Sequence, residues 1–370
     1  MEIAPALLEH WMRQYYFDTT IDIGSSGVES FSMPELRKLL GIRQKDLDQV
    51  TFSDSRTLGG LRLRDAIGAR WAKGDPDRVM ATHGSSEGIF LVMNALLRPG
   101  DEVITVSPCY QQLFAMAESN GCELKYWSLD FDQGFVPDIE RLKSLISPRT
   151  RMVVMNFPHN PTGISLTAEQ QEDLVNVVAE ARSYLLWDGA FTEMTYDRPP
   201  LPDPGTWYDR TITLGTLSKG YGLPGLRVGW CIAAPSILEQ FVNLRDYMTL
   251  HLSPLIELIA EHAVRKSHLL LRVRMEQARA NLNVLADWVE SHGEFVDWAP
   301  PHGGVCAFLR MPRVGDVEAF CHRFAREYHA LLVPGTCFHC PGFVRLGFGG
   351  PASQFREGLS RLSDLLVKTV

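Results

Sequence analysis

The feature that most constrains the fold is a regular alternation of short apolar runs with helix-period segments between residues 80 and 234. Most of the apolar runs are hydrophobic on both faces, as strands buried inside a parallel sheet are. The strand candidates are residues 102–106, 152–157, 184–188, 211–217 and 228–234. Between two of them, Thr167 and Gln170 form a capping-box pattern ahead of an apolar helical face. This alternation predicts an α/β fold with a mostly parallel sheet flanked by crossover helices.

A different rhythm follows Pro254, and it predicts a second domain. No proline or glycine occurs from there until Gly293, so we expect one long helix or two abutting helices. Short strands, turns and a last amphipathic helix near residues 355–367 complete the chain. We therefore expect a large domain at residues 46–265, and a smaller α+β domain formed by residues 1–45 and 266–370.

The charge balance argues against nucleic acid and membrane as partners. The 370 residues carry 36 basic and 44 acidic side chains, for a net charge of −8, and no basic run would follow a phosphate backbone. No long apolar segment and no secretory signal pattern is present, so a cytoplasmic protein is expected.

Seven scattered cysteines do not suggest a disulfide framework. The single CxxC pair, Cys337 and Cys340, does not complete a zinc site, so no metal is predicted.

The stretch "TLSKGYGLPGLRVGW" places Lys219 in a glycine-rich turn directly after a predicted buried strand. Partial removal from water lowers the pKa of a lysine and makes its amine a nucleophile, which suits a Schiff base with a carbonyl compound. The GxxxxGK[ST] pattern of a nucleotide-binding loop does not precede this lysine. Most lysines are solvated surface charges, so the stretch alone leaves that alternative open.

Two polar side chains follow other strands of the predicted sheet. Asp188 ends the strand "YLLWD", at the sheet edge where ligand-binding groups collect, although a helix cap would use the same residue type. A buried carboxylate opposite a Schiff-base lysine is what pyridoxal phosphate requires, because it keeps the pyridine nitrogen protonated. Asn160 lies in the proline-rich turn "NFPHNPTG", which is rigid enough to aim its amide at a ligand oxygen.

The segment "HGSSEG" predicts a phosphate site. Gly84, Ser85 and Ser86 would present backbone amides and hydroxyls at the start of an apolar helix. Arg227 would add a charge-assisted hydrogen bond to the same phosphate. Each feature has an ordinary alternative, which is a capped turn for the glycine–serine run and a surface ion pair for the arginine.

Taken together, these motifs resemble those of the fold-type I pyridoxal-phosphate enzymes, the aspartate aminotransferase-like class I and II group. The resemblance rests on "NPTG", on "DGAF" 28 residues after Asn160, and on "TLSKGYGLPGLRVGW", and it extends over nearly the whole chain. It implies the transferase fold of that group, in which the mostly parallel sheet has seven strands. It also implies pyridoxal 5'-phosphate as the cofactor, and a homodimer whose active sites form between two subunits.

The resemblance further implies a role for each candidate residue. Lys219 would form the Schiff base and move the Cα proton, Asp188 would pair with the pyridine nitrogen, and Asn160 would bond the phenolic oxygen of the ring. Tyr110 would stack on the ring face, and Arg345 would clamp the α-carboxylate of the substrate in a bidentate manner. The phosphate would be held by Gly84, Ser85, Ser86, Thr216, Ser218 and Arg227.

Two positions depart from the family pattern. Phe191 stands where a tyrosine often donates a second hydrogen bond to the phenolic oxygen, so the pKa of the Schiff base is expected to be higher than in ordinary aminotransferases. The tyrosine that reaches the phosphate from the neighbouring subunit is also missing, and the matching stretch offers Phe52, Asp54 or Ser55. A phosphate donor across the dimer interface is therefore not identified.

A longer set of segments, from "IDIGSSGVESFS" to "RDYMTLHLSPLIE", resembles a subgroup of this family that removes water from 3-hydroxy-L-arginine and closes a cyclic guanidine. That resemblance implies an amino acid substrate that carries a guanidinium group. Glu193, Asp22 and Glu29 are candidate partners of this group, and each would otherwise be a solvated or capping acid. Ser26 and Gly27 are further candidate substrate contacts. No base for the guanidine is identified.

Two other functions stay open. A plain aminotransferase acting on an arginine-like amino acid would release a 2-oxo acid, and it needs no guanidine site. A non-catalytic cofactor sensor would carry a DNA-binding module ahead of the domain, whereas only about 45 residues precede the predicted large domain, too few for such a module.

Overall fold

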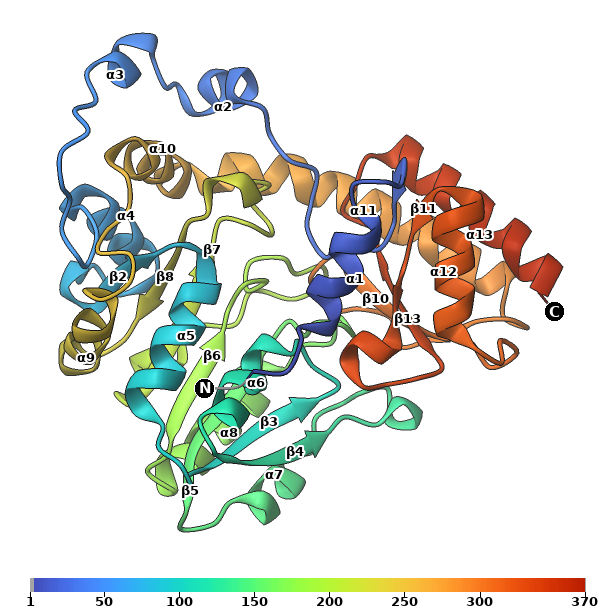
Figure 1. Cartoon of the computed structure of the whole chain (residues 1–370), viewed down its shortest axis with the longest axis horizontal. Coiled ribbons are helices and arrows are strands. Elements are labelled where there is room, and N and C mark those ends of the chain that lie inside the picture. The colour runs from blue at the N-terminus through green and yellow to red at the C-terminus, as the bar shows by residue number, and fades with distance from the viewer. Residues whose placement is uncertain (1–2, 370) are drawn as a thin grey trace.

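A seven-stranded sheet forms the centre of the computed structural model, which describes residues 3–369 (Figure 1). The strand order is β2-β8-β7-β6-β5-β3-β4. All pairs from β7 to β4 are parallel, whereas β8 runs antiparallel to both of its neighbours. The strands are Val79–Thr82 (β2), Glu102–Ser107 (β3), Glu123–Ser128 (β4), Thr150–Asn156 (β5), Tyr184–Asp188 (β6), Thr211–Thr216 (β7) and Gly229–Ile232 (β8). The predicted α/β fold with a mostly parallel seven-stranded sheet is confirmed.

The five strand candidates correspond to β3, β5, β6, β7 and β8, and two strands, β2 and β4, lie outside them. The interior strands are buried along nearly their whole length, which explains their continuous apolar runs. β4 is an edge strand with only Trp127 fully covered, so its sequence carries a weaker apolar signal.

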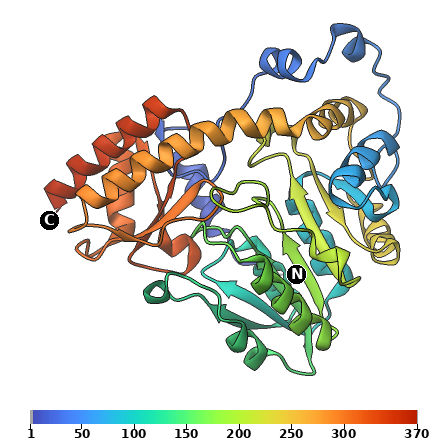
Figure 2. The same cartoon turned by 180° about the vertical axis from the view of Figure 1, so that it is seen from behind.

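Helices cover both faces of this sheet. α5 packs on β7 and β8 from one side, together with α6 and α9, and α8 covers the other side, as the opposite views of Figures 1 and 2 show. The predicted capping box at the start of α8 is confirmed, because the Gln170 amide donates to Thr167 Oγ1 at 3.1 Å. The helices are Leu61–Trp71 (α4), Gly84–Leu96 (α5), Gln112–Ser119 (α6), Ile139–Leu145 (α7), Ala168–Glu180 (α8), Pro235–Arg245 (α9) and Pro254–Arg265 (α10).

A second, antiparallel sheet of four strands lies beside the first, in the order β12-β13-β10-β9. Two abutting helices, α10 and α11, follow Pro254, as one of the two sequence alternatives predicts. The C-terminal helix α13 is longer than the predicted 355–367. The elements of this region are Ser267–Ser291 (α11), Asp297–Trp298 (β9), Cys306–Arg310 (β10), Val317–Tyr328 (α12), Ala330–Leu331 (β11), Val333–Pro334 (β12), Phe343–Gly347 (β13) and Ala352–Thr369 (α13).

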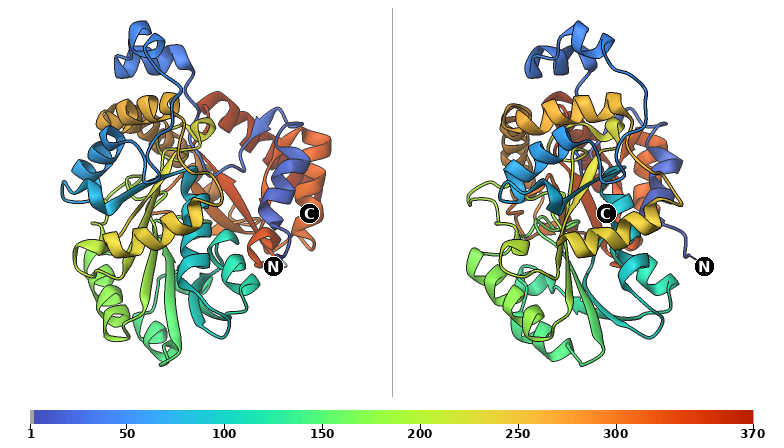
Figure 3. Two further views of the ribbon diagram at one scale, coloured as in Figure 1. Left: turned by 60° about the vertical axis from the view of Figure 1, so that its left-hand side comes forward. Right: turned by 90° about the vertical axis from the view of Figure 1, so that its left-hand side faces the viewer.

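The N-terminal segment divides its contacts between the two regions. Its first helix, α1 (Leu7–Tyr15), packs near the four-stranded sheet, and β1 (Ile21–Asp22) pairs in parallel with β11. The next helices, α2 (Met33–Leu40) and α3 (Gln44–Asp48), project from the body in both views of Figure 3. Leu36 and Leu40 of α2 share a hydrophobic cluster with α4 and α10. The domain boundaries at residues 45 and 265 stay a prediction.

Short 3-10 turns connect several of these elements, at Pro76–Arg78, Phe131–Gln133, Pro204–Thr206, Pro224–Leu226 and Gly335–Phe338. All seven cysteines are free thiols. Within residues 3–369, no helix is both long enough and apolar enough to cross a bilayer.

Candidate active site

A cavity of about 850 Å³ opens at the carboxyl ends of β5, β6 and β7. The N-terminal segment and Arg345 of β13 supply its other walls, so the cavity lies between the two sheets. It brings together all predicted site residues except Gly84 and Glu193. Those that line it are Ser26, Gly27, Ser85, Ser86, Tyr110, Asn160, Asp188, Thr216, Ser218, Lys219, Arg227 and Arg345.

Lys219 follows β7 and extends its amine into the cavity. Its Nζ donates to Ser26 Oγ at 3.1 Å and lies 5.9 Å from the centre of the Phe191 ring. Burial, with a further contribution from the charge of Arg345, lowers the pKa of Lys219 to about 8. A much larger fraction of the amine is therefore neutral and nucleophilic near neutral pH than in a solvent-exposed lysine.

Asp188 ends β6 at the same cavity, with 6% of its surface exposed. Its Oδ1 accepts a hydrogen bond from the Ala190 amide at 3.1 Å, and Asn156 Nδ2 donates to its main-chain oxygen at 2.9 Å. Burial raises the pKa of Asp188 to about 6, while the Ala190 amide and the charge of Lys219 oppose this shift. No cation pairs with Asp188 within 4 Å among residues 3–369, so the site holds a buried carboxylate that a ligand cation would stabilise.

Asn160 and Arg345 join the strand edge to the four-stranded sheet. The Asn160 amide donates to Asn156 Oδ1 at 2.9 Å, and Arg345 Nη1 donates to Asn160 Oδ1 at 3.1 Å. Arg345 is almost completely buried, and its Nε and Nη2 donate to the Gly24 carbonyl at 3.1 and 3.0 Å. Asn156 was missed by sequence reasoning, although it lies within a predicted strand and ends β5, where its side chain bonds the main chain of both Asp188 and Asn160.

A group of donors gathers at the start of α5. Ser85 and Ser86 occupy the first turn of the helix, and Arg227 donates to Ser218 Oγ at 3.5 Å. Thr216 Oγ1 donates to Ser218 Oγ at 3.0 Å. Gly84 lies behind these side chains at φ +74°, and a Cβ there would come within 2.5 Å of Arg227 Nη2. Free amides at a helix start, hydroxyls and a guanidinium together form an anion site.

Tyr110 forms another part of the cavity wall, and Glu9 of α1 fixes its hydroxyl. The Tyr110 hydroxyl donates to Glu9 Oε1 at 2.7 Å. Burial, together with the charge of Glu9, raises the pKa of Tyr110 far above its usual value, so the phenol stays neutral. Sequence reasoning did not select Glu9, because only the docking of α1 brings it to the cavity.

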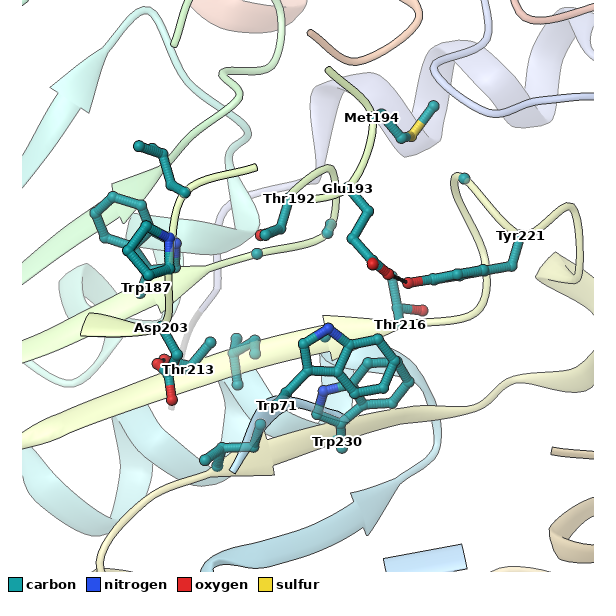
Figure 4. A pocket seen from close by; sticks show the side chains of 18 of the residues that line it. Trp71, Trp187, Thr192, Glu193, Met194, Asp203, Thr213, Thr216, Tyr221 and Trp230 are labelled. Atoms are coloured by element: carbon teal, nitrogen blue, oxygen red, sulfur yellow. Dashed lines mark hydrogen bonds between the residues drawn. The ribbon is translucent and has the colours of Figure 1, made fainter. Parts of the chain in front are cut away.

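Glu193 does not reach this cavity. Its carboxylate accepts hydrogen bonds from Tyr221 and Arg70, as Figure 4 shows for Tyr221. It lines a separate cavity of about 60 Å³, beside the stacked rings of Trp71 and Trp230. The expected substrate contact of Glu193 therefore does not fit its position, because both carboxylate oxygens are turned toward partners on α4 and on the loop after Lys219.

The other two candidate acids line the cavity but already have partners. Asp22 Oδ1 accepts hydrogen bonds from the Gly24 and Ser25 amides at 2.9 Å each. Glu29 forms an ion pair with Arg274 at 2.9 Å. Their roles in substrate binding stay predictions.

The stretch expected to replace the cross-subunit tyrosine lies outside the cavity of this single chain. Phe52 is 77% exposed, Asp54 lies 3.2 Å from His251 Nε2, and Ser55 Oγ donates to Glu257 at 2.8 Å. None of the three is thereby identified as a phosphate ligand.

The cavity fits pyridoxal 5'-phosphate. Lys219 supplies an amine of lowered pKa for the aldehyde, and the unpaired buried carboxylate of Asp188 matches a pyridine nitrogen that carries a proton. The donor group at the start of α5 matches the phosphate, and Gly84 keeps the space that Arg227 needs beside it.

Comparisons with known proteins agree with this geometry. The sequence pattern described as "Aminotransferase class I and II" matches residues 51–362. Capreomycidine synthase from Streptomyces vinaceus is 43% identical over 98% of this chain and 93% of its own length. Aspartate aminotransferase from Thermotoga maritima is 28% identical over 92% of this chain and 90% of its own length. The crystal structure of the PLP-dependent cyclase OrfR is 41% identical and superposes with a TM-score of 0.95, covering 100% of this chain and 99% of that one.

The pattern match spans most of the chain, and the high identity extends over almost all of it. The cofactor is accordingly pyridoxal 5'-phosphate, and the protein is a pyridoxal-phosphate enzyme. From its strand-edge lysine to its overall fold, the chain belongs to the class I and II aminotransferase family.

Proposed function

We propose that this protein is a capreomycidine synthase, which converts 3-hydroxy-L-arginine to the cyclic guanidino amino acid capreomycidine. The observation that carries this proposal is the 43% identity to a capreomycidine synthase over 98% of the chain. In the reaction, the Cα proton and the β-hydroxyl leave as one water. A guanidine N–H then adds across the same two carbons, the nitrogen to Cβ and a proton to Cα, so that the product is the substrate minus one water.

Residues at the strand edge would hold the cofactor. Lys219 would form the covalent link, Asp188 would pair with the pyridine nitrogen, and Asn160 would contact the phenolic oxygen. Tyr110 would cover the ring face, and the phosphate would lie against Ser85, Ser86, Thr216, Ser218 and Arg227. When bound, pyridoxal phosphate supplies an electron sink next to the substrate Cα.

The chain's own side chains would direct the proton transfers. Lys219, with its pKa of about 8, would take the proton from Cα and later return one to the same atom. Arg345 would bind the α-carboxylate, because its guanidinium is fixed at the cavity wall by Gly24 and Asn160. Ser26, 3.1 Å from Lys219 Nζ, would orient the amine between these steps.

We further propose that the enzyme acts as a cytoplasmic homodimer. Phe52 and Tyr247 are 77% and 92% exposed, and they belong to neighbouring segments that Thr57 and Asp246 connect at 3.3 Å. Large exposed apolar side chains on neighbouring segments are typical of a protein interface. Light scattering after gel filtration would give the mass of a dimer, and the mass of one chain would exclude it.

The alternative is an aminotransferase, which the similarity to aspartate aminotransferase favours. Incubation of the holoenzyme with 3-hydroxy-L-arginine in D2O separates the two. A synthase gives a product one water lighter than the substrate, with its amino group retained and one deuterium at Cα. An aminotransferase gives a 2-oxo acid and leaves the amino group on the cofactor, and that result would contradict the proposed synthase activity.

A further inference from the structure

The helix α1 of the N-terminal segment forms one wall of the cavity, and one side of the helix faces the cavity. Four side chains of this helix and its C-cap line the cavity, namely Glu9, Met12, Arg13 and Tyr16. Met12, Arg13 and Tyr16 follow Glu9 by three, four and seven residues, a spacing that places all four on one side of the helix. The adjacent side, with Leu8, Trp11 and Tyr15, is buried. Figure 1 shows α1 in front of β10 and β13, with its N-terminal end directed toward α6.

The helix is fixed in this position by hydrogen bonds at both ends. Trp11 Nε1 donates to the Leu332 carbonyl at 2.8 Å, and the Leu7 amide donates to Gln111 Oε1 at 2.8 Å. The Tyr15 hydroxyl lies 2.5 Å from His322 Nδ1. A side chain on the cavity face of α1 therefore has a defined position relative to the strand edge.

Glu9 is the acid on this face, and one of its two carboxylate oxygens, Oε2, is free to accept hydrogen bonds from a ligand. Tyr110 donates to Oε1 at 2.7 Å, and within residues 3–369 no hydrogen bond reaches Oε2 and no ion pair reaches either oxygen. Arg13 lies one turn further along the same face without pairing with it. The negative charge of Glu9 acts on Lys219, where it opposes the lowering of the pKa, so the acid faces the region in which the substrate is bound.

The other acids of the cavity are engaged. Asp22 accepts two backbone amides, Glu29 is paired with Arg274, and Asp188 lies buried where the cofactor nitrogen is expected. The cavity is also lined by four basic side chains, Arg13, Lys219, Arg227 and Arg345. A guanidinium needs a carboxylate partner among these basic groups, and Glu9 offers one on the cavity face of α1. Glu29 would first lose its ion pair with Arg274, and the Asp22 carboxylate is held by the Gly24 and Ser25 amides.

We propose that Glu9 is the specificity residue that binds the guanidinium of the substrate, with Tyr110 holding its carboxylate in place. This inference rests on the proposed function, which requires a guanidino substrate. The free Oε2 of Glu9 would accept N–H donors of the guanidinium while Oε1 keeps the Tyr110 hydroxyl, and at least one nitrogen of the guanidinium stays free. Because Tyr110 also faces the cofactor position, the Glu9–Tyr110 pair would turn the substrate side chain back toward its own Cβ.

The test compares ligands that differ in charge but hardly in shape. Dissociation constants of L-arginine and the uncharged isostere L-citrulline are measured by calorimetry on the wild-type holoenzyme and on Glu9→Gln. The wild type should prefer arginine by about tenfold to hundredfold. In Glu9→Gln the preference should fall below about threefold, while citrulline affinity changes little, because glutamine keeps an acceptor for the Tyr110 hydroxyl.

Two further variants make the outcome specific. Glu29→Gln makes the same chemical change at another acid of the cavity, and it should keep the preference for arginine. Tyr110→Phe keeps the charge of Glu9 but removes its orienting hydrogen bond, so the preference should fall less than in Glu9→Gln. Melting temperature and the visible band of the cofactor report whether each variant is folded and loaded.

The two proposals fail in different ways. A wild-type enzyme without any preference for arginine over citrulline contradicts the guanidino substrate itself. A wild-type preference that survives in a folded, loaded Glu9→Gln protein overturns the assignment of Glu9 alone. A preference that disappears in Glu29→Gln instead would transfer the role to that acid.

Discussion

The carboxyl edge of the seven-stranded sheet and the α1 wall border the same cavity, yet they are built differently. Asp188, Asn160 and Thr216 at the edge are buried at 3 to 6% exposure and are held by main-chain and strand-end hydrogen bonds. On the wall, Tyr16 is 42% exposed and Glu9 relies on one hydrogen bond from Tyr110. The edge is part of the core, whereas the wall is a docked helix. Side chains at the sheet edge can therefore carry out the chemistry that a family shares, while side chains of the docked helix determine which substrate is bound.

The largest effect is expected at the edge, from Lys219→Ala. Removing the amine should lower turnover by about 10⁴-fold, because it removes the group that moves the Cα proton. Borohydride reduction followed by mass spectrometry should attach the cofactor to the wild-type chain and not to the variant. Lys143→Ala, which changes an exposed lysine paired with Glu140, is the control and should be labelled normally. Label retained in Lys219→Ala would refute the assignment of this lysine.

A smaller effect, with a sign that depends on the cofactor, is expected from Asp188→Asn. Burial raises the pKa of Asp188 from 3.8 to about 6, so in the cofactor-free protein this group's favourable contribution is present below pH 4 and is lost as the pH rises through 6. The variant should then be more stable than the cofactor-free wild type above pH 6, by about 3 kcal/mol, since each pKa unit corresponds to about 1.4 kcal/mol.

With the cofactor bound, the order should reverse, because asparagine cannot pair with a protonated ring nitrogen. Urea unfolding of both proteins at pH 4.5 and pH 8, with and without pyridoxal phosphate, measures the two signs. Equal stabilities of the cofactor-free proteins at pH 8 would show that Asp188 is not a destabilised acid.

Phe191→Tyr should lower the pKa of the bound cofactor without changing the α1 wall. A tyrosine hydroxyl there would add a hydrogen bond to the phenolic oxygen of the cofactor, and charge-assisted bonds of this kind contribute about 1.5 to 3 kcal/mol. The pKa at which the visible band of the bound cofactor changes should fall by about one to two units. A pH titration of absorbance checks this, and a shift in the opposite direction would contradict the expected geometry at residue 191.

The smallest effect is expected behind the edge, at Tyr221. Its bond to Glu193 links the loop after Asp188 to the loop after Lys219, so Tyr221→Phe should lower kcat by a few-fold and the free energy of unfolding by about 1 to 2 kcal/mol. Tyr208→Phe is a matched control, because that hydroxyl donates to the Ser183 carbonyl away from the cavity. The control should lose stability without losing kcat. An equal loss of kcat in both would mean that Tyr221 does not position the loops.

The sequence predicted the edge better than the wall for a physical reason. Motifs such as "NPTG" and "TLSKGYG" are contiguous, and each follows a strand whose apolar run fixes where it ends, so Asn160 and Lys219 could be placed in advance. Glu9 lies on a helix whose position depends on docking against Leu332 and Gln111, which are remote in sequence. Glu193 shows the converse, since its closeness to Asp188 in sequence suggested a shared cavity, but the turn directs its side chain toward Tyr221.

The same distinction explains the strands. Interior strands were visible because both of their faces are apolar, whereas β4 at the edge of the sheet and the two-residue strands around β11 depend on tertiary pairing. The pairing of β1 with β11, 309 residues apart at their first partners, leaves no local pattern in the sequence.

The assignment of the chemistry to the strand edge and of substrate choice to the α1 wall is tested most directly by a crystal structure of the holoenzyme with L-arginine. This ligand lacks the β-hydroxyl that would leave as water. We expect the α-carboxylate on Arg345, the Cα next to Lys219, and the guanidinium at a hydrogen-bond distance of about 3 Å from Glu9. A guanidinium turned away from α1 and bound to Glu29 or Asp22, with Glu9 contacting Tyr110 alone, would contradict the account.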